Sequence, residues 1–169
     1  MKTLGLIRHA KSSWDNHTLL DIDRPLNHRG QRDLQRMPHY LKDLKFHPDL
    51  MLTSPAIRAR TTAIGFANIL GYSQDKIQII ETLYGATLIQ LLAIIEKIKD
   101  AHNSVALFGH NPVFTEAVNY LTDRDLDNLP TCSIAIISLP IDSWYQINAT
   151  NLSQGKLEHL FFPNMSGAD

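Results

Sequence analysis

The pattern of hydrophobic and polar residues alternates along this chain between two kinds of segment. Short apolar runs of about five residues have the length and composition of buried β-strands. Between them, apolar residues recur every three or four positions, as on one face of an amphipathic helix. The predicted strands are Thr3–Ile7, Asp49–Thr53, Ile77–Ile80, Val105–Phe108, Ile134–Leu139, Trp144–Ala149 and Leu157–Phe162.

The helical stripes lie between these strands and have recognisable ends. A proline at position 38 predicts a kink or break in the first helix, and Gly71 suits the end of the second. A proline is also favourable in the first turn of a helix, so Pro112 predicts the start of the last one. The predicted helices cover His28–Leu44, a stripe from Ala63 to Leu70, Leu88–Ile98, and Pro112–Leu121, and a long polar loop spans Lys11–Asn27.

Strands that alternate with helices predict an α/β fold, a three-layer sandwich in which a mostly parallel central sheet has helices on both faces. With 169 residues, one domain is expected. We place it at residues 1–162, followed by a C-terminal tail at 163–169. The connection between Ile80 and Leu88 is too short to form a lid, so no cap domain is expected.

Composition excludes several classes of protein. Apolar residues make up 44% and charged residues 20% of the chain, which is typical of a folded domain. The formal net charge of −1 provides no overall positive field for nucleic acid. No apolar run approaches the ~20 residues that cross a bilayer, and the single Cys132 excludes a disulfide framework. We therefore expect a soluble, cytoplasmic protein that binds neither nucleic acid nor membrane.

Four residues with basic side chains follow the ends of separate predicted strands. Arg8 and His9 come directly after the first strand, Arg58 follows the second by one turn, and His110 follows the fourth. Ligands of open α/β sheets bind beyond the carboxyl ends of the parallel strands. Arginine forks match a tetrahedral oxyanion, so a phosphate pocket is the natural interpretation. Taken singly, each residue could instead be a solvated strand end, an exposed helix position or a turn residue.

A metal site is the other common use of histidine, and the sequence does not favour it. The remaining histidines among the eight are scattered over loops and helices. None shows the spacing of two histidines and a carboxylate on one element. Arginines beside His9 would also repel a divalent cation. We expect neither a metal nor a cofactor.

At these residues the chain resembles the histidine phosphatase superfamily. The resembling motifs are Leu6–Ala10 (LIRHA), Ser54–Thr62 (SPAIRARTT) and Phe108–Pro112 (FGHNP), in the family's order. The segment Asp23–Gly30 (DRPLNHRG) further resembles the small, capless SixA-type phosphohistidine phosphatases. This resemblance implies a phosphoglycerate-mutase-like fold. It also implies that His9 is the nucleophile, that Arg8, Arg58 and His110 bind the phosphoryl group with it, and that a phosphohistidine intermediate forms without metal.

Many relatives present an acidic residue as proton donor near the end of the third strand, and Glu81 is the carboxylate at that place. It could equally be a solvated strand end. Two residues of the polar loop are also ambiguous. Trp14 is either a substrate-facing anchor or a packed residue, and Arg24 either reaches the pocket or forms a structural salt bridge.

The function predicted from these residues is hydrolysis of phosphohistidine in proteins, with a histidine phosphotransfer domain as the expected partner in signal transduction. An open site suits a phosphorylated side chain on a protein surface, and imidazole leaves more readily than an alkoxide. Two alternatives stay open. One is a small phosphomonoesterase for sugar or nucleotide phosphates, for which Glu81 would matter, and the other is a non-catalytic module that binds phosphate or a phosphoprotein.

Overall fold

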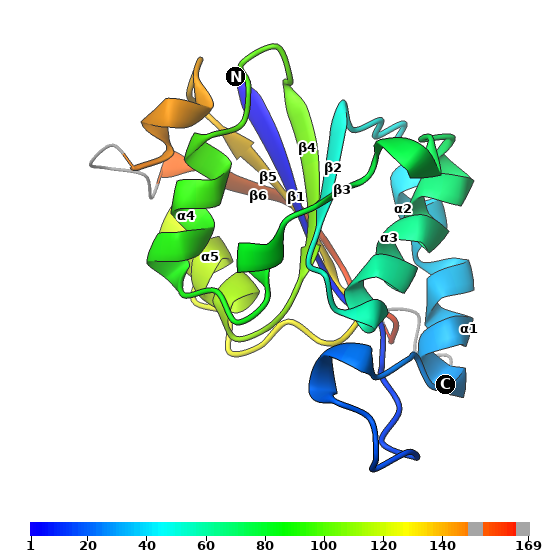
Figure 1. The fold of residues 1–169 in the computed structure, drawn as a ribbon. Coiled ribbons are helices and arrows are strands. Elements are labelled where there is room, and N and C mark those ends of the chain that lie inside the picture. The colour runs from blue at the N-terminus through cyan, green and yellow to red at the C-terminus, as the bar shows by residue number, and fades with distance from the viewer. Residues whose placement is uncertain (149–153, 165–169) are drawn as a thin grey trace.

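A six-stranded mixed sheet forms the centre of the molecule (Figure 1). The computed structural model describes residues 1–148 and 154–164. The strand order is β3-β2-β4-β1-β5-β6. The strands are β1 (Lys2–Arg8), β2 (Leu50–Thr53), β3 (Gln78–Ile79), β4 (Ser104–Gly109), β5 (Ile134–Leu139) and β6 (Lys156–Phe161).

The half of the sheet made by β3, β2, β4 and β1 is parallel, and β5 and β6 are antiparallel additions at one edge. In the β1–β4 pair, Ile7 lies opposite Phe108 and Arg8 opposite Gly109. In the β2–β4 pair, Thr53 lies opposite the same Phe108. The carboxyl ends of β1, β4 and β2 therefore meet side by side at one edge, which is what positions the site.

Helices cover both faces of the sheet, which confirms the predicted three-layer sandwich. In Figure 1, α1–α3 lie on one side of the sheet and α4 and α5 on the other. The α-helices are α1 (His28–Arg36), α2 (Pro38–Asp43), α3 (Ile57–Leu70), α4 (Leu88–Glu96) and α5 (Val113–Leu121). The short 3₁₀-helices are η1 (Asp21–Asp23), η2 (Gln74–Lys76), η3 (Glu81–Leu83) and η4 (Trp144–Asn148).

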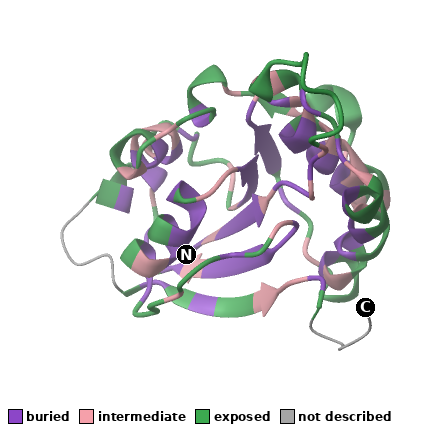
Figure 2. Ribbon diagram, turned by 90° about the horizontal axis from the view of Figure 1, so that it is seen from below, coloured by how far each residue is buried: buried purple, intermediate pink, exposed green. Residues whose placement is uncertain are grey.

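Alternation along the central strands divides the core into two clusters. In β4, Val105 and Leu107 pack toward α4 and α5, whereas Ala106 and Phe108 belong to the cluster on the other face, with Phe66 of α3. Viewed from the carboxyl ends of the parallel strands, the buried residues form a continuous centre and the exposed ones lie outside (Figure 2). Burial of both faces is why these strands read as continuous apolar runs.

The predicted break in the first helix and the predicted end of the second are confirmed, although the second helix begins at Ile57, before the apolar stripe. The first breaks at Met37, and Pro38 begins α2, where its missing N–H costs no hydrogen bond. The helix α3 ends at Gly71, whose φ of 74° is the left-handed conformation that glycine adopts without strain. The edge strand predicted at Ile77–Ile80 shortens to Gln78–Ile79.

The predicted strand at Trp144–Ala149 is wrong. Residues Trp144–Asn148 form the 3₁₀-helix η4, and Ala149 lies outside the described residues. Trp144 and Ile147 are both buried, and their spacing of three matches a 3₁₀ turn rather than strand alternation. The Trp144 indole N–H donates to the carbonyl of His102 at 2.7 Å, and its backbone N–H to Asp100 at 2.9 Å. These bonds satisfy backbone and indole groups without a partner strand.

The segment between β1 and α1 projects from the sheet edge as an arm (Figure 1). Its two branches are joined by an antiparallel bridge between Ser12 and Leu26. At the base, Asn27 caps α1 through Gly30. A Cβ on Gly30 would lie 2.1 Å from the carbonyl oxygen of Lys11, so only glycine permits this close approach. The predicted loop is therefore an ordered arm that includes η1.

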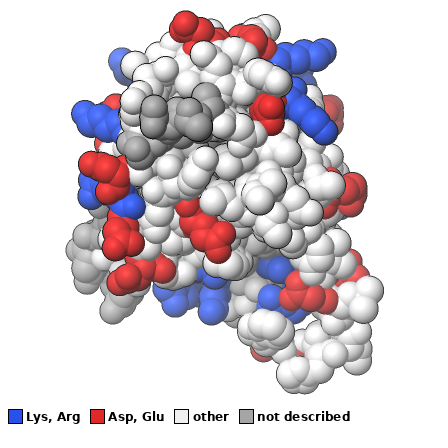
Figure 3. All heavy atoms as spheres, turned by 90° about the vertical axis from the view of Figure 1, so that its left-hand side faces the viewer, with Lys and Arg blue, Asp and Glu red and all other residues white. Residues whose placement is uncertain are grey.

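Three expectations concern the whole chain. No helix in the described part is long and apolar enough to cross a membrane. Basic and acidic side chains are interspersed on the face shown in Figure 3, so this face carries no patch of a single charge. The division between a domain ending at residue 162 and a tail at 163–169 stays a prediction.

Candidate active site

The four basic side chains singled out in the sequence line one cavity. Arg8 ends β1 and His9 follows it, Arg58 lies in the first turn of α3, and His110 follows β4. The cavity has a volume of about 520 Å³ and is open to solvent. Its position beyond the carboxyl ends of adjacent parallel strands is the usual ligand site of this architecture.

The His9 backbone is held between two neighbouring segments. Its N–H donates to the carbonyl of Gly109 at 3.0 Å, and its carbonyl accepts from the N–H of Cys132 at 3.0 Å. The ring Nδ1 lies 2.7 Å from the carbonyl oxygen of Ala10. A carbonyl only accepts, so Nδ1 carries the proton and Nε2 keeps a free lone pair.

The environment of His9 keeps this ring neutral. The residue is only 8% exposed, and burial lowers the pKa of its imidazole to about 3. The hydrogen bond to Ala10 opposes part of that shift, and the nearby His110, Arg58 and Arg8 lower the pKa further. At neutral pH the lone pair of Nε2 is therefore available as a nucleophile without prior loss of a proton.

Both arginines offer hydrogen-bond donors to the cavity. Arg8 Nη1 donates to the carbonyl of Leu129 at 2.7 Å, and Arg58 Nη1 donates to the carbonyl of Asp21 at 2.7 Å. The Nε atoms of Arg8 and Arg58 are buried and have no hydrogen-bond partner among the described residues. Both side chains line the cavity, and their guanidinium groups carry the charge that pairs with a tetrahedral oxyanion.

His110 completes the ring of donors. Its Nε2 lies 2.8 Å from the Ser54 hydroxyl, and its ring centroid lies 5.2 Å from that of His9. Burial, followed by the charge of Arg58, lowers the pKa of His110 to about 4, against an opposing effect of Asp21. Two neutral imidazoles therefore lie beside the positive charges of Arg8 and Arg58 in the wall of the cavity. This is an arrangement that attracts a phosphoryl dianion while leaving a nucleophile free.

Two residues of the site escaped the sequence interpretation. Asp21, in η1 of the arm, accepts a hydrogen bond from Arg58 Nη2 at 3.0 Å and another from the Tyr84 hydroxyl. Hydrogen bonds from Tyr84 and Arg58 lower the pKa of Asp21 to about 2, although burial opposes them. The hydrogen bond to Asp21 in turn raises the pKa of Tyr84. In the sequence, the spacing Asp21-x-x-Arg24 was a signal that could have indicated Asp21. The turn at Gly85 was a signal that could have indicated Tyr84.

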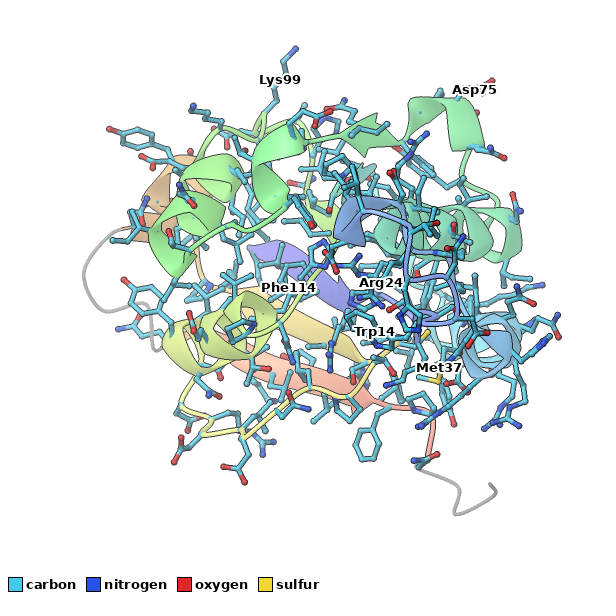
Figure 4. All side chains as sticks on the ribbon, turned by 60° about the horizontal axis from the view of Figure 1, so that its bottom comes forward. Trp14, Arg24, Met37, Asp75, Lys99 and Phe114 are labelled. Carbon is cyan, nitrogen blue, oxygen red and sulfur yellow. The ribbon has the colours of Figure 1, made fainter. Side chains whose placement is uncertain are left out.

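The two ambiguous residues of the arm lie together at the rim. The Arg24 guanidinium is stacked 3.5 Å from the centre of the Trp14 ring, as the two labelled side chains in Figure 4 show. Arg24 lines the cavity and also forms a salt bridge to Asp21 at 3.1 Å, so both of its interpretations hold. Trp14 is 64% exposed, so it is not a packed residue.

Glu81 is not brought to the cavity. It begins η3 with an exposed side chain and is not among the residues that line the site. From the same segment, Tyr84 reaches the cavity instead.

The structure also shows how possible metal ligands are grouped. Within residues 1–148 and 154–164, no three His, Cys, Asp or Glu side chains are grouped so that they could hold an ion.

Known proteins with this sequence pattern and fold agree on one family. The model of the histidine phosphatase superfamily (branch 1) matches residues 4–87. An uncharacterized chloroplastic protein of Arabidopsis thaliana is 33% identical over 174 residues, covering 98% of this chain and 79% of that protein.

Solved structures extend the likeness to the whole fold. A candidate phosphohistidine phosphatase, SixA, from Agrobacterium tumefaciens superposes with a TM-score of 0.81 at 25% identity, covering 96% of this chain and 98% of its own. The protein histidine phosphatase SixA in complex with tungstate superposes with a TM-score of 0.77 at 20% identity, covering 94% and 95%. The chain belongs to the histidine phosphatase superfamily, and its fold is that of the SixA-type members.

Proposed function

We propose that this phosphatase hydrolyses phosphohistidine in proteins, through a covalent phosphohistidine on His9 and without a metal ion. The likeness to SixA supports the class of substrate, and tungstate in one SixA structure is a tetrahedral analogue of phosphate. The neutral His9 ring, with Nε2 free, supports the covalent step. The expected partner is a histidine phosphotransfer domain in the cytoplasm.

The reaction takes place in two transfers. In the first, His9 Nε2 attacks phosphorus, the P–N bond to the substrate ring breaks, and the electron pair of that bond stays on the leaving nitrogen. Arg8, Arg58 and His110 donate hydrogen bonds to the phosphoryl oxygens, whose charge they stabilise without reorganising. In the second, water attacks phosphorus and releases His9 and inorganic phosphate.

One observation carries the preference for a nitrogen leaving group: neither the Asp21 carboxyl nor the Tyr84 phenol in the cavity is a ready proton donor. Hydrogen bonds from Tyr84 and Arg58 hold the pKa of Asp21 at about 2, so this carboxyl is ionised. The same carboxylate raises the pKa of Tyr84, which makes the phenol a weaker acid. An alkoxide needs such a donor, whereas an imidazole leaves without one.

Hydrolysis of a phosphate ester by this site would need Glu81 as the donor, and its exposed position outside the cavity argues against that role. Replacement Glu81→Gln is therefore expected to change kcat/KM for a sugar phosphate by less than about twofold, because no contact with the leaving oxygen is lost. The measurement is phosphate release at several substrate concentrations. A loss of tenfold or more would favour the phosphomonoesterase instead.

The proposal is tested by a panel of substrates with a chelator present. We expect kcat/KM for a histidine phosphotransfer domain phosphorylated on histidine to exceed that for glucose 6-phosphate by at least about 100-fold. The reason is that the histidine imidazole is a good leaving group, whereas the sugar alkoxide is a poor one. Addition of EDTA is expected to leave both rates unchanged. Faster turnover of the sugar phosphate would overturn the proposal. Binding of the phosphoprotein without turnover would also overturn it and would favour the alternative of a non-catalytic binding module.

A further inference from the structure

A fixed carboxylate stands inside this anion-binding cavity. Asp21 lines the cavity together with His9, Arg58 and His110. Three donors from three segments hold it in place. They are Arg24 Nε on Oδ1 at 3.1 Å, Arg58 Nη2 on Oδ2 at 3.0 Å, and the Tyr84 hydroxyl on Oδ2. The side chain is still 49% exposed and lines the cavity, and Oδ1 accepts one of the three bonds, so it can accept another.

The negative charge of Asp21 needs its own explanation. It opposes binding of a phosphoryl dianion, since like charges repel. Holding Arg58 in place does not require the charge, because a single amide oxygen would accept the bonds from Arg58 and Tyr84, while the amide NH2 would lose the bond from Arg24. The charge does suit a substrate that carries a positive group next to its phosphoryl group. A phosphorylated imidazole is such a substrate when its second ring nitrogen is protonated.

We propose that Asp21 is a specificity-determining residue that selects phosphohistidine in its protonated, imidazolium form. This inference rests on the proposed function. The carboxylate accepts the N–H of the substrate ring while Arg8, Arg58 and His110 hold the phosphoryl group. When His9 Nε2 forms its bond to phosphorus, the P–N bond breaks and its electron pair stays on the leaving nitrogen. The ring then departs as a neutral imidazole that keeps its N–H, so no proton moves in this step.

The charge balance of the transfer matches this arrangement. Before the step, the substrate ring is the imidazolium beside Asp21. Afterwards, phosphorylated His9 is the imidazolium, and its Nδ1–H donates to the Ala10 carbonyl. Each of the two cationic rings therefore has an oxygen acceptor for its N–H. A neutral alcohol leaving group gains nothing from Asp21, and a carboxylated phosphate ester is repelled by it.

The site also predicts a pH dependence. The charged and titratable groups that face Asp21 are Arg24, Arg58, Tyr84 and His110, with Arg8, His9 and Lys11 elsewhere on the cavity wall. Asp21 is ionised throughout the neutral range because hydrogen bonds from Tyr84 and Arg58 lower its pKa to about 2. An ionised Asp21 stabilises the protonated substrate ring, so the proposal predicts that activity falls at high pH where this ring loses its proton, and that Asp21 moves this fall to higher pH.

The test is Asp21→Asn, which removes the charge and keeps an oxygen acceptor for Arg58. The probes are a phosphohistidine-bearing phosphotransfer domain and p-nitrophenyl phosphate, whose leaving group is an anion. We expect kcat/KM for the phosphohistidine to fall about tenfold, the difference between a charged and a neutral acceptor. We expect kcat/KM for p-nitrophenyl phosphate to fall by less than about threefold, and the alkaline limb for phosphohistidine to move down by about one pH unit.

A matched control is Asp23→Asn, which makes the same charge change on an exposed residue of the same 3₁₀-helix, outside the cavity. It is expected to leave both substrates and the alkaline limb unchanged. An equal loss for both substrates in Asp21→Asn, with no shift of the limb, would make Asp21 only a positioning residue for Arg58 and would overturn this inference alone. Failure of the unaltered protein to hydrolyse phosphohistidine would overturn the proposed function as well.

Discussion

Replacement His9→Ala is expected to abolish turnover, lowering kcat/KM by at least about 10⁴-fold for any phosphoryl donor, because it removes the nucleophile that forms the proposed covalent intermediate. His9 Nδ1 is bound to the Ala10 carbonyl, which leaves the lone pair of Nε2 free, and His9 lines the same cavity as Arg58 and His110. The measurement is phosphate release. It is supported by labelling with a radioactive phosphoryl donor, in which the acid-labile label on the protein is lost in the variant.

The control for this variant is His39→Ala, since His39 is an exposed histidine of α2 away from the cavity, and it is expected to keep full activity. Burial lowers the pKa of His9 to about 3. As pH falls from 7 to 5, the free enzyme therefore loses no activity through protonation of this ring. Undiminished phosphatase activity in His9→Ala would assign the chemistry to another group and remove the basis of the proposed function.

Much of the site could be predicted because its residues follow strands with unambiguous apolar runs. Phe108 and Thr53 lie level in the β2–β4 pair, and Ile7 and Phe108 in the β1–β4 pair. Once those strands are parallel neighbours, Arg8, His9 and His110 must meet, and Arg58 joins them from the helix that follows β2. The prediction needed only the positions where the apolar runs end and the rule that ligands bind beyond carboxyl ends.

The remaining parts of the site depend on the course of irregular segments, which periodicity does not encode. The arm brings Asp21 to Arg58, 37 positions away in the chain, and Tyr84 to Asp21, 63 positions away. Its position depends on contacts such as the approach of Gly30 to the Lys11 carbonyl. Glu81 is another example, since it follows a strand in the sequence but lies outside the cavity. The chain forms the 3₁₀-helix η3 at Glu81–Leu83, and the next residue, Tyr84, lines the cavity instead.

The replacement Arg58→Lys is expected to lower kcat/KM by about 100-fold, although the charge is retained. The Arg58 guanidinium makes two bonds to Asp21, through Nη1 at 2.7 Å and Nη2 at 3.0 Å, and also lines the cavity that would hold the phosphoryl group. A lysine ammonium is a single point and cannot satisfy Asp21 and an equatorial oxygen in this geometry.

Steady-state kinetics of Arg58→Lys, with inhibition by inorganic phosphate, measures this loss, and the inhibition constant is expected to rise with it. The matched control is Arg60→Lys, an exposed position of the same helix outside the cavity, which is expected to be neutral. If Arg58→Lys kept activity within about threefold, charge alone would suffice at this position. The fork of the Arg58 guanidinium would then not be required to bind the transferring group.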